Sequence, residues 1–277
     1  MSKIELSHIF IYPVKSLAGI SLSSSVVTPS GLQYDRRWMI VNNKGLFITQ
    51  RLHPKLSLIH TEIIGDQIRL TAPDGNNLML PLSLNQGDVA SVRVWSDHVD
   101  GIQASKTHND WITDYLGIDA RFIYMPETTH RPVDNSFSKS SLDSVSFADG
   151  FPYLLISSGS LNDLNKKLNH KNETSVSINR FRPNLVVSGC EPYVEDKWTE
   201  YNMGGNIFYN VKPCSRCIMT TIDATTGQKG IEPLKTLLEY RKTGNKAYFG
   251  QNVLIDLNYD NSWKVSVGDT VVLSDTD

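Results

Sequence analysis

The feature that most constrains this chain is the pattern of its first hundred residues, where short apolar runs alternate with turn residues. Seven such runs lie between Ile4 and Trp95, and turn signals such as Asn43-Lys44-Gly45 and Pro73-Asp74-Gly75 separate them. The runs show no helical period. Short strands at near-regular spacing are typical of an antiparallel sheet or a small barrel. We therefore predict an N-terminal β module over residues 1–103.

The second half, residues 104–277, mixes further strands with a few helices. Apolar residues at helical spacing predict one helix that ends at Gly117, a second that Ser160 N-caps, and a third that begins at Pro233. A long polar segment, Glu127–Asp149, is expected to be a loop. The predicted fold class is mainly β with a few helices, built largely of β-barrels. The expected strands are Tyr153–Ser157, Asn184–Ser188, Asn206–Val211, Asn252–Leu257 and Trp263–Leu273, the last interrupted by a turn signal at Val267-Gly268-Asp269.

Composition excludes several classes of protein. Of the 277 residues 40% are hydrophobic and 20% charged, which suits a compact, soluble protein with a substantial core. The formal net charge of −2 gives no overall attraction to nucleic acid or to anionic lipid. Apolar runs such as Tyr153–Ile156 are far shorter than the ~20 residues of a membrane span. Three cysteines argue against a disulfide framework. We therefore expect a cytoplasmic protein with no nucleic acid or membrane partner.

Two of the three cysteines lie in one CxxC motif, Cys214-Ser215-Arg216-Cys217, directly after an apolar strand expected to end at Val211. A structural zinc site needs four ligands, but the chain has no second CxxC and no pair of histidines at ligand spacing. A thioredoxin-like motif opens a helix, whereas Ile218–Ile222 is expected to be extended. A thiolate on a soft metal centre is a third interpretation, because Arg216 lowers a thiol pKa and attracts an anionic cofactor. Inert, packed cysteines remain a fourth.

Basic residues recur at three other places with polar neighbours. Lys15-Ser16 ends a strand, Arg36 follows an aspartate, and Arg182 and Asn184 flank a proline that has no amide donor. If they converge, these groups can hold a phosphate or the heteroatoms of a ring. Taken singly, each is more typical of a solvated surface charge than of a ligand contact.

Asp149 opens the turn Asp149-Gly150-Phe151-Pro152, where its carboxylate is either a proton donor or orienter or an ordinary turn residue. The chain has no dinucleotide-binding glycine motif, no P-loop and no hydrolase elbow.

Taken together, these segments resemble MOSC proteins that carry an N-terminal MOSC β-barrel domain, the family of the mitochondrial amidoxime reducing component and its bacterial relatives. The match runs in order from about Ile11 to the C-terminus. Its motifs are Tyr12-Pro13-Val14-Lys15-Ser16, Gly31-Leu32 through Asp35-Arg36-Arg37-Trp38, Thr49-Gln50-Arg51, Phe181-Arg182-Pro183-Asn184, Cys214-Ser215-Arg216-Cys217 with Thr220-Thr221, and Phe249-Gly250-Gln251-Asn252. The resemblance implies an N-terminal β-barrel domain over residues 1–103 and a MOSC domain over residues 104–277.

The resemblance implies a molybdenum cofactor, Mo-molybdopterin, whose metal is also bound by one protein thiolate. That catalytic metal ligand corresponds to Cys217. As a hypothesis, Asp149 is a catalytic proton relay. Asn252 matches a position that is Tyr in mitochondrial members. The cofactor-binding residues implied are Lys15, Ser16, Arg36, Gly150, Phe151, Arg182, Asn184, Ser215, Arg216, Cys217 and Asn252.

The activity implied is the reduction of small N-oxygenated compounds, namely hydroxylamines, N-hydroxylated bases and amidoximes. Because the chain has no four-cysteine cluster pattern, electrons are expected to come from a separate donor protein, ferredoxin-like or a flavoprotein reductase. The alternative is a non-catalytic module that carries the cofactor or its sulfur, since MOSC domains also occur fused to cofactor sulfurases. The arrangement seen here, with no pyridoxal-dependent region, favours the reductase.

Overall fold

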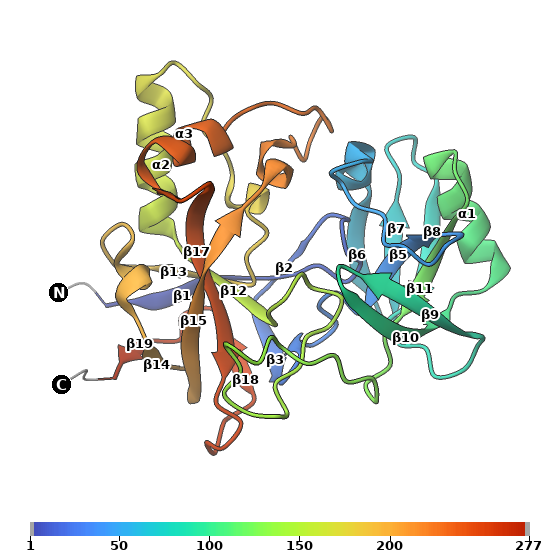
Figure 1. Ribbon diagram of the computed structural model, residues 1–277, viewed down its shortest axis with the longest axis horizontal. Helices are drawn as coiled ribbons and strands as arrows, with labels where there is room; N and C mark the ends of the chain where they lie inside the picture. The colour runs from blue at the N-terminus through green and yellow to red at the C-terminus, as the bar shows by residue number, and fades with distance from the viewer. Residues whose placement is uncertain (1–2, 275–277) are drawn as a thin grey trace.

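The computed structural model describes residues 3–274, and its strands form four sheets (Figure 1). The fold class predicted from the sequence is confirmed, because strands dominate and the described residues contain three α-helices. Residues 1–2 and 275–277, at the outer ends of the two predicted domains, lie outside the described residues. Within residues 3–274, no helix combines the length and the apolar run that crossing a membrane would require.

The largest sheet has nine strands in the order β19-β14-β15-β17-β12-β13-β1-β2, with β16 paired to β17. Neighbouring strands are antiparallel except β12 and β13, which are parallel and are connected through helix α2. The strands are β1 (Glu5–Ile11), β2 (Ile20–Leu22), β12 (Tyr153–Ser157), β13 (Leu185–Ser188), β14 (Glu200–Met203), β15 (Asn206–Arg216), β16 (Lys242–Thr243), β17 (Lys246–Ile255) and β19 (Val271–Leu273).

Three smaller antiparallel sheets complete the fold. The four-stranded sheet has the order β5 (Trp38–Asn42), β11 (Ala120–Tyr124), β10 (Asp97–Gln103) and β9 (Val89–Val94). The two three-stranded sheets are β18 (Lys264–Ser266), β3 (Ser24–Thr28) and β4 (Gly31–Leu32), and β6 (His60–Ile64), β7 (Gln67–Thr71) and β8 (Asn77–Pro81).

The helices cover the ends and edges of the sheets. In Figure 1, α2 and α3 lie together beside the large sheet, and α1 lies at the far side of the other half. Four short 3-10 helices join strands. The bounds are α1 (Lys106–Leu116), α2 (Ser158–His170), α3 (Leu234–Tyr240), η1 (Pro54–Leu58), η2 (Ile178–Arg180), η3 (Val194–Lys197) and η4 (Ile218–Thr221).

Strand pairing crosses the predicted division at residues 103 and 104 in both directions. From the N-terminal side, β1 and β2 join the large sheet, where Ile9 pairs with Leu185, and β3 pairs with β18. From the other side, β11 pairs with β5, and α1 packs on β11. The division stays a prediction of the sequence, and the two halves visible in Figure 1 are each built from both sides of it.

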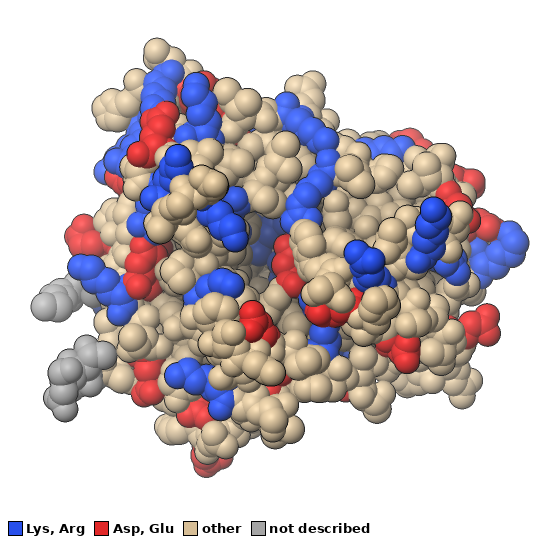
Figure 2. Space-filling view, in the orientation of Figure 1, with Lys and Arg blue, Asp and Glu red and all other residues tan. Residues whose placement is uncertain are grey.

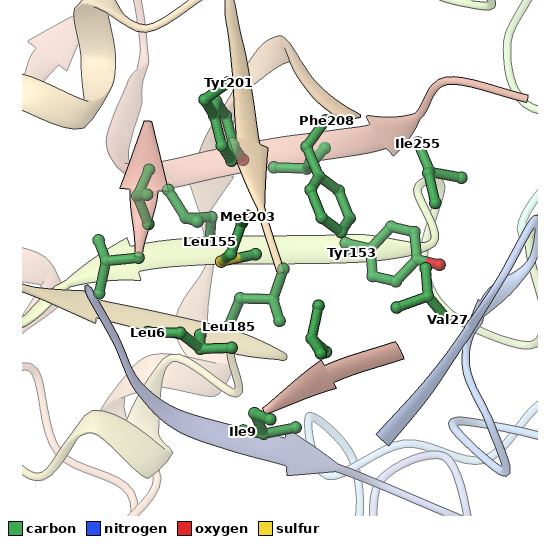
Figure 3. Close-up of a cluster of buried hydrophobic side chains, with 14 of the residues drawn as sticks. Leu6, Ile9, Val27, Tyr153, Leu155, Leu185, Tyr201, Met203, Phe208 and Ile255 are labelled. Carbon is green, nitrogen blue, oxygen red and sulfur yellow. The ribbon is translucent and has the colours of Figure 1, made fainter. Parts of the chain in front are cut away.

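The main core fills the space enclosed by the large sheet and the β3–β18 strands. Figure 3 shows Phe208 of this core between Tyr153 and Tyr201. The Phe208 ring meets that of Tyr153 edge-on at 5.7 Å and stacks on that of Tyr201 at 6.0 Å. A second core around Trp38 fills the other half, where the Trp38 indole contacts Phe122 and Tyr124. Tyr34 and Ile63 pack against both cores and so connect the two halves.

Several expected elements differ from the structure around the cysteine motif. Strand β15 continues to Arg216, so Cys214 lies inside the strand and Cys217 is the first residue after it. The expectation of an extended Ile218–Ile222 is wrong, because Ile218–Thr221 forms η4. The hydroxyls of Thr220 and Thr221 donate to the carbonyls of Cys217 and Ile218 at 3.0 and 2.8 Å. Such local bonds let threonine favour a turn over a strand.

Other differences have equally local causes. Helix α2 begins one turn earlier than predicted, because Ser157 rather than Ser160 is its N-cap and accepts the Ser160 amide at 3.0 Å. Strand β10 was not predicted, since its polar residues such as His98 and Asp100 obscure the alternation. The turn predicted at Val267-Gly268-Asp269 is confirmed between β18 and β19.

We expect Phe208→Ala to lower the free energy of unfolding by about 3–5 kcal/mol, because it leaves a cavity between two aromatic rings. Urea denaturation followed by circular dichroism measures this loss. Val272→Ala, at a position 57% exposed in β19, is the control and should change stability by less than about 0.5 kcal/mol. Equal effects of the two substitutions would show that Phe208 is not part of the core.

Candidate active site

One cavity lies where the two halves meet, and it opens on the face shown in Figure 2 as a hollow with Lys and Arg side chains around and inside it. It contains about 880 Å³ of empty space, part of it open to solvent. Every residue that the sequence predicted for the site lines this cavity: Lys15, Ser16, Arg36, Asp149, Gly150, Phe151, Arg182, Asn184, Ser215, Arg216, Cys217 and Asn252.

Distant segments bring these side chains together. Lys15 and Ser16 follow β1, Arg36 precedes β5, and the Asp149–Phe151 turn leads into β12. Arg182 and Asn184 lie between η2 and β13, and Asn252 comes from β17. The convergence places residues more than two hundred positions apart on one surface. Their individual roles in binding a cofactor stay predictions.

Sequence reasoning missed several residues of the same cavity. Thr49 and Arg51 come from the loop after β5, and Arg180 comes from η2. Cys214 lies beside Cys217 in the lining. The signal for Arg51 was present, because it belongs to the Thr49-Gln50-Arg51 motif of the family resemblance. Arg180 directly precedes another of these motifs, at Phe181, but neither arginine stood out as a single charge.

The lining is strongly cationic. Among the described residues that line the cavity, the charged side chains are Asp149 and the six cations Lys15, Arg36, Arg51, Arg180, Arg182 and Arg216. Arg216 Nη2 is buried and has no hydrogen-bond partner within residues 3–274. A buried guanidinium nitrogen without an acceptor favours an anionic ligand. The cavity therefore fits a group that carries a phosphate.

Tyr12 holds two of these arginines. The guanidinium carbons of Arg36 and Arg182 lie over its ring, 4.2 and 4.1 Å from the centroid. Burial raises the pKa of Tyr12 to about 12 although both arginines oppose the shift, so the phenol stays neutral. Burial, and then Arg36, lowers the pKa of Arg182 to about 10. The ring offers both cations an attractive surface in a place where they repel each other.

The backbone of this wall is strained. Ser16, Arg36 and Arg182 adopt left-handed conformations with φ of 73°, 49° and 55°. Side-chain donors fix the strained segments: Gln50 Nε2 donates to the Ser16 carbonyl at 2.7 Å and Arg182 Nη1 to the Leu17 carbonyl at 2.7 Å. Arg36 Nη2 donates to the Arg182 carbonyl at 3.1 Å. Strain of this kind concentrates at functional sites.

Asp149 accepts hydrogen bonds from two donors and lies near a second cation. Lys15 Nζ lies 2.6 Å from its Oδ1, Trp95 Nε1 donates to the same oxygen at 3.2 Å, and Arg51 Nη2 lies 3.7 Å from Oδ2. Crowding by the cavity wall raises the pKa of Asp149, but Lys15 and then Arg51 outweigh it and hold this pKa well below its usual range. The side chain is still 61% accessible to solvent. Asp149 is therefore an anion at neutral pH, which suits an orienter better than a proton donor.

Lys15 is the buried partner of this pair. Besides Asp149, its ammonium donates to the Phe147 carbonyl at 2.7 Å. Burial lowers its pKa even though Asp149 opposes the shift. A lysine with a lowered pKa gives up its proton more readily than one in water.

The thiols lie at the end of β15, where the pairing with β17 is irregular. Register shifts occur between Asn210 and Lys212 and again between Pro213 and Ser215. Asn252 Nδ2 donates to the Lys212 carbonyl at 3.1 Å across the first irregularity. Bulges re-aim side chains, which accounts for the place of the CxxC motif in the cavity wall. Burial raises the pKa of Cys214, against the effect of Arg216.

Within residues 3–274, no three His, Cys, Asp or Glu side chains come together in a way that would hold a metal ion by themselves. The thiols of the CxxC motif are free, and so is that of Cys190, which is not part of the cavity lining.

The Tyr12 hydroxyl is buried without a partner within the described residues. We expect Tyr12→Phe to raise the free energy of unfolding by about 1 kcal/mol, because it removes a desolvated polar group and keeps the ring under both arginines. Urea denaturation of protein made without a pterin cofactor measures the change. Tyr201→Phe is the matched control and should lose stability, since its hydroxyl donates to Asn210 Oδ1 at 3.2 Å. A lower free energy of unfolding in Tyr12→Phe would contradict the prediction.

Asp149→Asn should change how stability depends on pH. The pKa of Asp149 is lower in the folded chain than in the unfolded chain, so its ion pairs stabilise the fold above about pH 4 and this contribution disappears as the pH falls through the folded pKa. The difference in Tm between wild type and variant should therefore shrink on acidification from neutral pH. Asp100→Asn, at an exposed position of β10, is the control and should show a flat difference. A flat difference for Asp149→Asn as well would exclude this ion pair as a source of stability.

The sequence matches two family models along its length. The MOSC N-terminal beta barrel domain matches residues 3–119, and the MOSC domain matches residues 143–272.

Proteins similar over nearly the whole chain carry names that refer to amidoxime reduction or to the molybdenum cofactor. Human mitochondrial amidoxime-reducing component 1 is 34% identical, over 97% of this chain and 82% of the relative. Bovine mitochondrial amidoxime reducing component 2 is 32% identical, over 96% of this chain and 82% of the relative. Rice molybdenum cofactor sulfurase is 32% identical over 94% of this chain, which corresponds to 33% of the sulfurase. With its two matched domains and these relatives, the chain belongs to the family of MOSC proteins with an N-terminal MOSC β-barrel domain.

Proposed function

We propose that this protein is a molybdenum-cofactor-dependent reductase of small N-oxygenated compounds, such as hydroxylamines, N-hydroxylated bases and amidoximes. The observation that carries the proposal is the single cavity in which Cys217 shares the lining with six cationic side chains and one carboxylate. A thiolate suits a soft metal, and the cations suit an anionic cofactor. The names of the relatives, which refer to amidoxime reduction and to the molybdenum cofactor, support the same interpretation.

The residues present fit Mo-molybdopterin. Arg36, Arg182 and Arg216 would hold the phosphate, and the unpartnered Arg216 Nη2 offers it a donor. Polar and backbone groups of the same wall would contact the pterin, namely those of Ser16, Gly150, Phe151, Asn184, Ser215 and Asn252. Cys217 would supply the thiolate ligand. When bound, the cofactor supplies the two-electron chemistry that removes the substrate's oxygen.

The chain's own residues would supply the protons. The sequence suggested Asp149 as a proton relay. We infer instead that its ionised carboxylate orients Lys15 and does not give up a proton itself. Lys15, whose pKa is lowered by burial, is the proton donor to an oxygen bound in the cavity. Solvent that enters the open cavity would return the next proton to Lys15, while Asp149 at 2.6 Å keeps the ammonium group in position.

Electrons would come from a separate ferredoxin-like protein or flavoprotein reductase, and the cytoplasm is the compartment that we propose. The sulfurase similarity favours a second candidate, a module that carries the cofactor or its sulfur without catalysing a reduction. Both candidates would bind the cofactor, but only the reductase would convert an N-oxygenated substrate.

Cys217→Ser should lose molybdenum, because a hydroxyl is a poor ligand for a soft metal. The measurement is elemental analysis with a pterin fluorescence assay on protein from a cofactor-producing host. Cys190→Ser, outside the cavity lining, is the matched control and should keep both metal and pterin. Metal retained in Cys217→Ser would refute the ligand assignment. Wild-type protein that holds molybdenum and pterin but reduces no N-hydroxylated substrate with a chemical reductant would favour the carrier.

A further inference from the structure

Arg51 presents an unused guanidinium to the cavity. Its side chain is 23% exposed, and within residues 3–274 none of its side-chain donors makes a hydrogen bond. The closest carboxylate, Asp149, has Oδ2 at 3.7 Å from Nη2, which is longer than a hydrogen bond. What holds the group in place is the indole of Trp95, whose centroid lies 4.6 Å from the guanidinium carbon. Arg51 is thus fixed in position with its donors available.

Trp95 occupies a conformation that does not suit it. It is the first of the two residues that connect β9 to β10, where Val94 pairs with Asp97, and its φ is 56°. Two-residue hairpin turns of this kind favour Asn, Asp or Gly, and a bulky residue there is an outlier. The side chain is also 40% exposed, so burial does not explain it. A large aromatic residue in a strained, exposed turn points to a role in function.

The contacts of Trp95 indicate that role. Its Nε1 donates to Asp149 Oδ1 at 3.2 Å, its ring carries Arg51, and its other neighbour is the Phe47 ring at 5.0 Å. Lys15 binds the same Oδ1, which leaves Oδ2 of Asp149 free to accept. Trp95 therefore holds a cationic donor and an anionic acceptor side by side at the cavity wall.

We propose that Arg51 and Asp149 together bind the N–O group and the adjacent N–H group of the substrate, and that Trp95 is the positioning residue of this pair. This inference rests on the proposed function and adds the residues that bind and orient its substrate. Arg51 donates to the substrate oxygen, and Oδ2 of Asp149 accepts from the amino group beside it. A substrate with N–H beside N–O would make both contacts, whereas one without N–H would make only the contact with Arg51.

The kinetic test compares Trp95→Gly with Trp263→Gly. Trp263 is a matched control, since it is also left-handed, with φ of 54°, is 38% exposed, and is not part of the cavity lining. Glycine suits both backbones, so both variants should fold. With benzamidoxime, Trp95→Gly should raise KM about tenfold with kcat changed less than about twofold, because charged hydrogen bonds are lost in binding alone. With N,N-dimethylhydroxylamine, which has no N–H group, KM should rise less than about threefold.

Binding is also measured without turnover. Benzamidoxime is titrated into oxidised enzyme in the absence of an electron donor, and tryptophan fluorescence is recorded. The emission change expected in wild type and in Trp263→Phe should be absent in Trp95→Phe, which keeps a ring under Arg51 but loses the indole and its N–H donor.

The outcomes separate this inference from the proposed function. If wild type reduces neither substrate, the proposed function fails. If wild type is active and Trp95→Gly has the KM values of Trp263→Gly, the inference is overturned while the function stands. Loss of molybdenum in Trp95→Gly would show that Trp95 retains the cofactor, and would also overturn the inference. An equal rise in KM for both substrates would overturn it as well.

Discussion

The repulsion among the cations around one cavity is the constraint on which the rest of the site depends. Arg36 and Arg182 lie over one Tyr12 ring, and burial costs each of them solvation. The buried carboxylate of Asp35 offsets part of this cost, because it accepts from Arg36 Nη1 at 2.6 Å and from the Tyr12 amide at 2.7 Å. One aromatic ring and one carboxylate thus keep two like charges together at a place that suits an anionic ligand.

This arrangement needs the whole chain. Strand β1 enters the large sheet through β13, then leaves it to bring Lys15 to the boundary between the halves. The turn at Asp149 returns to the same boundary before β12, and Arg51 reaches it from the other half. Because neither half lines the cavity alone, a fragment of the chain would hold only part of the charge cluster.

From the sequence, the fold class and the residues of the site are easier to predict than the local turns and side-chain contacts that arrange those residues. Strand β12 is a short continuous apolar run that ends at Ser157, so its bounds followed from the pattern alone. The turn after Cys217 did not, because threonine hydroxyls override the β propensity of Ile218–Ile222. The contacts of Trp95 with Arg51 and Asp149 escaped notice for another reason: they join segments far apart in the chain, and no local pattern records such a contact.

The strained positions of the cavity connect stability with function. Ser16, Arg36, Trp95 and Arg182 all have left-handed backbones, where glycine would relieve strain but remove the side chain. Each of these side chains either lines the cavity or holds a residue that does. The fold accommodates the strain because bonds from Gln50 and Arg182 to neighbouring carbonyls hold the backbone there. Substitutions that relax these turns should therefore preserve the fold more readily than they preserve the site, which is the behaviour that distinguishes a functional cavity from a packing defect.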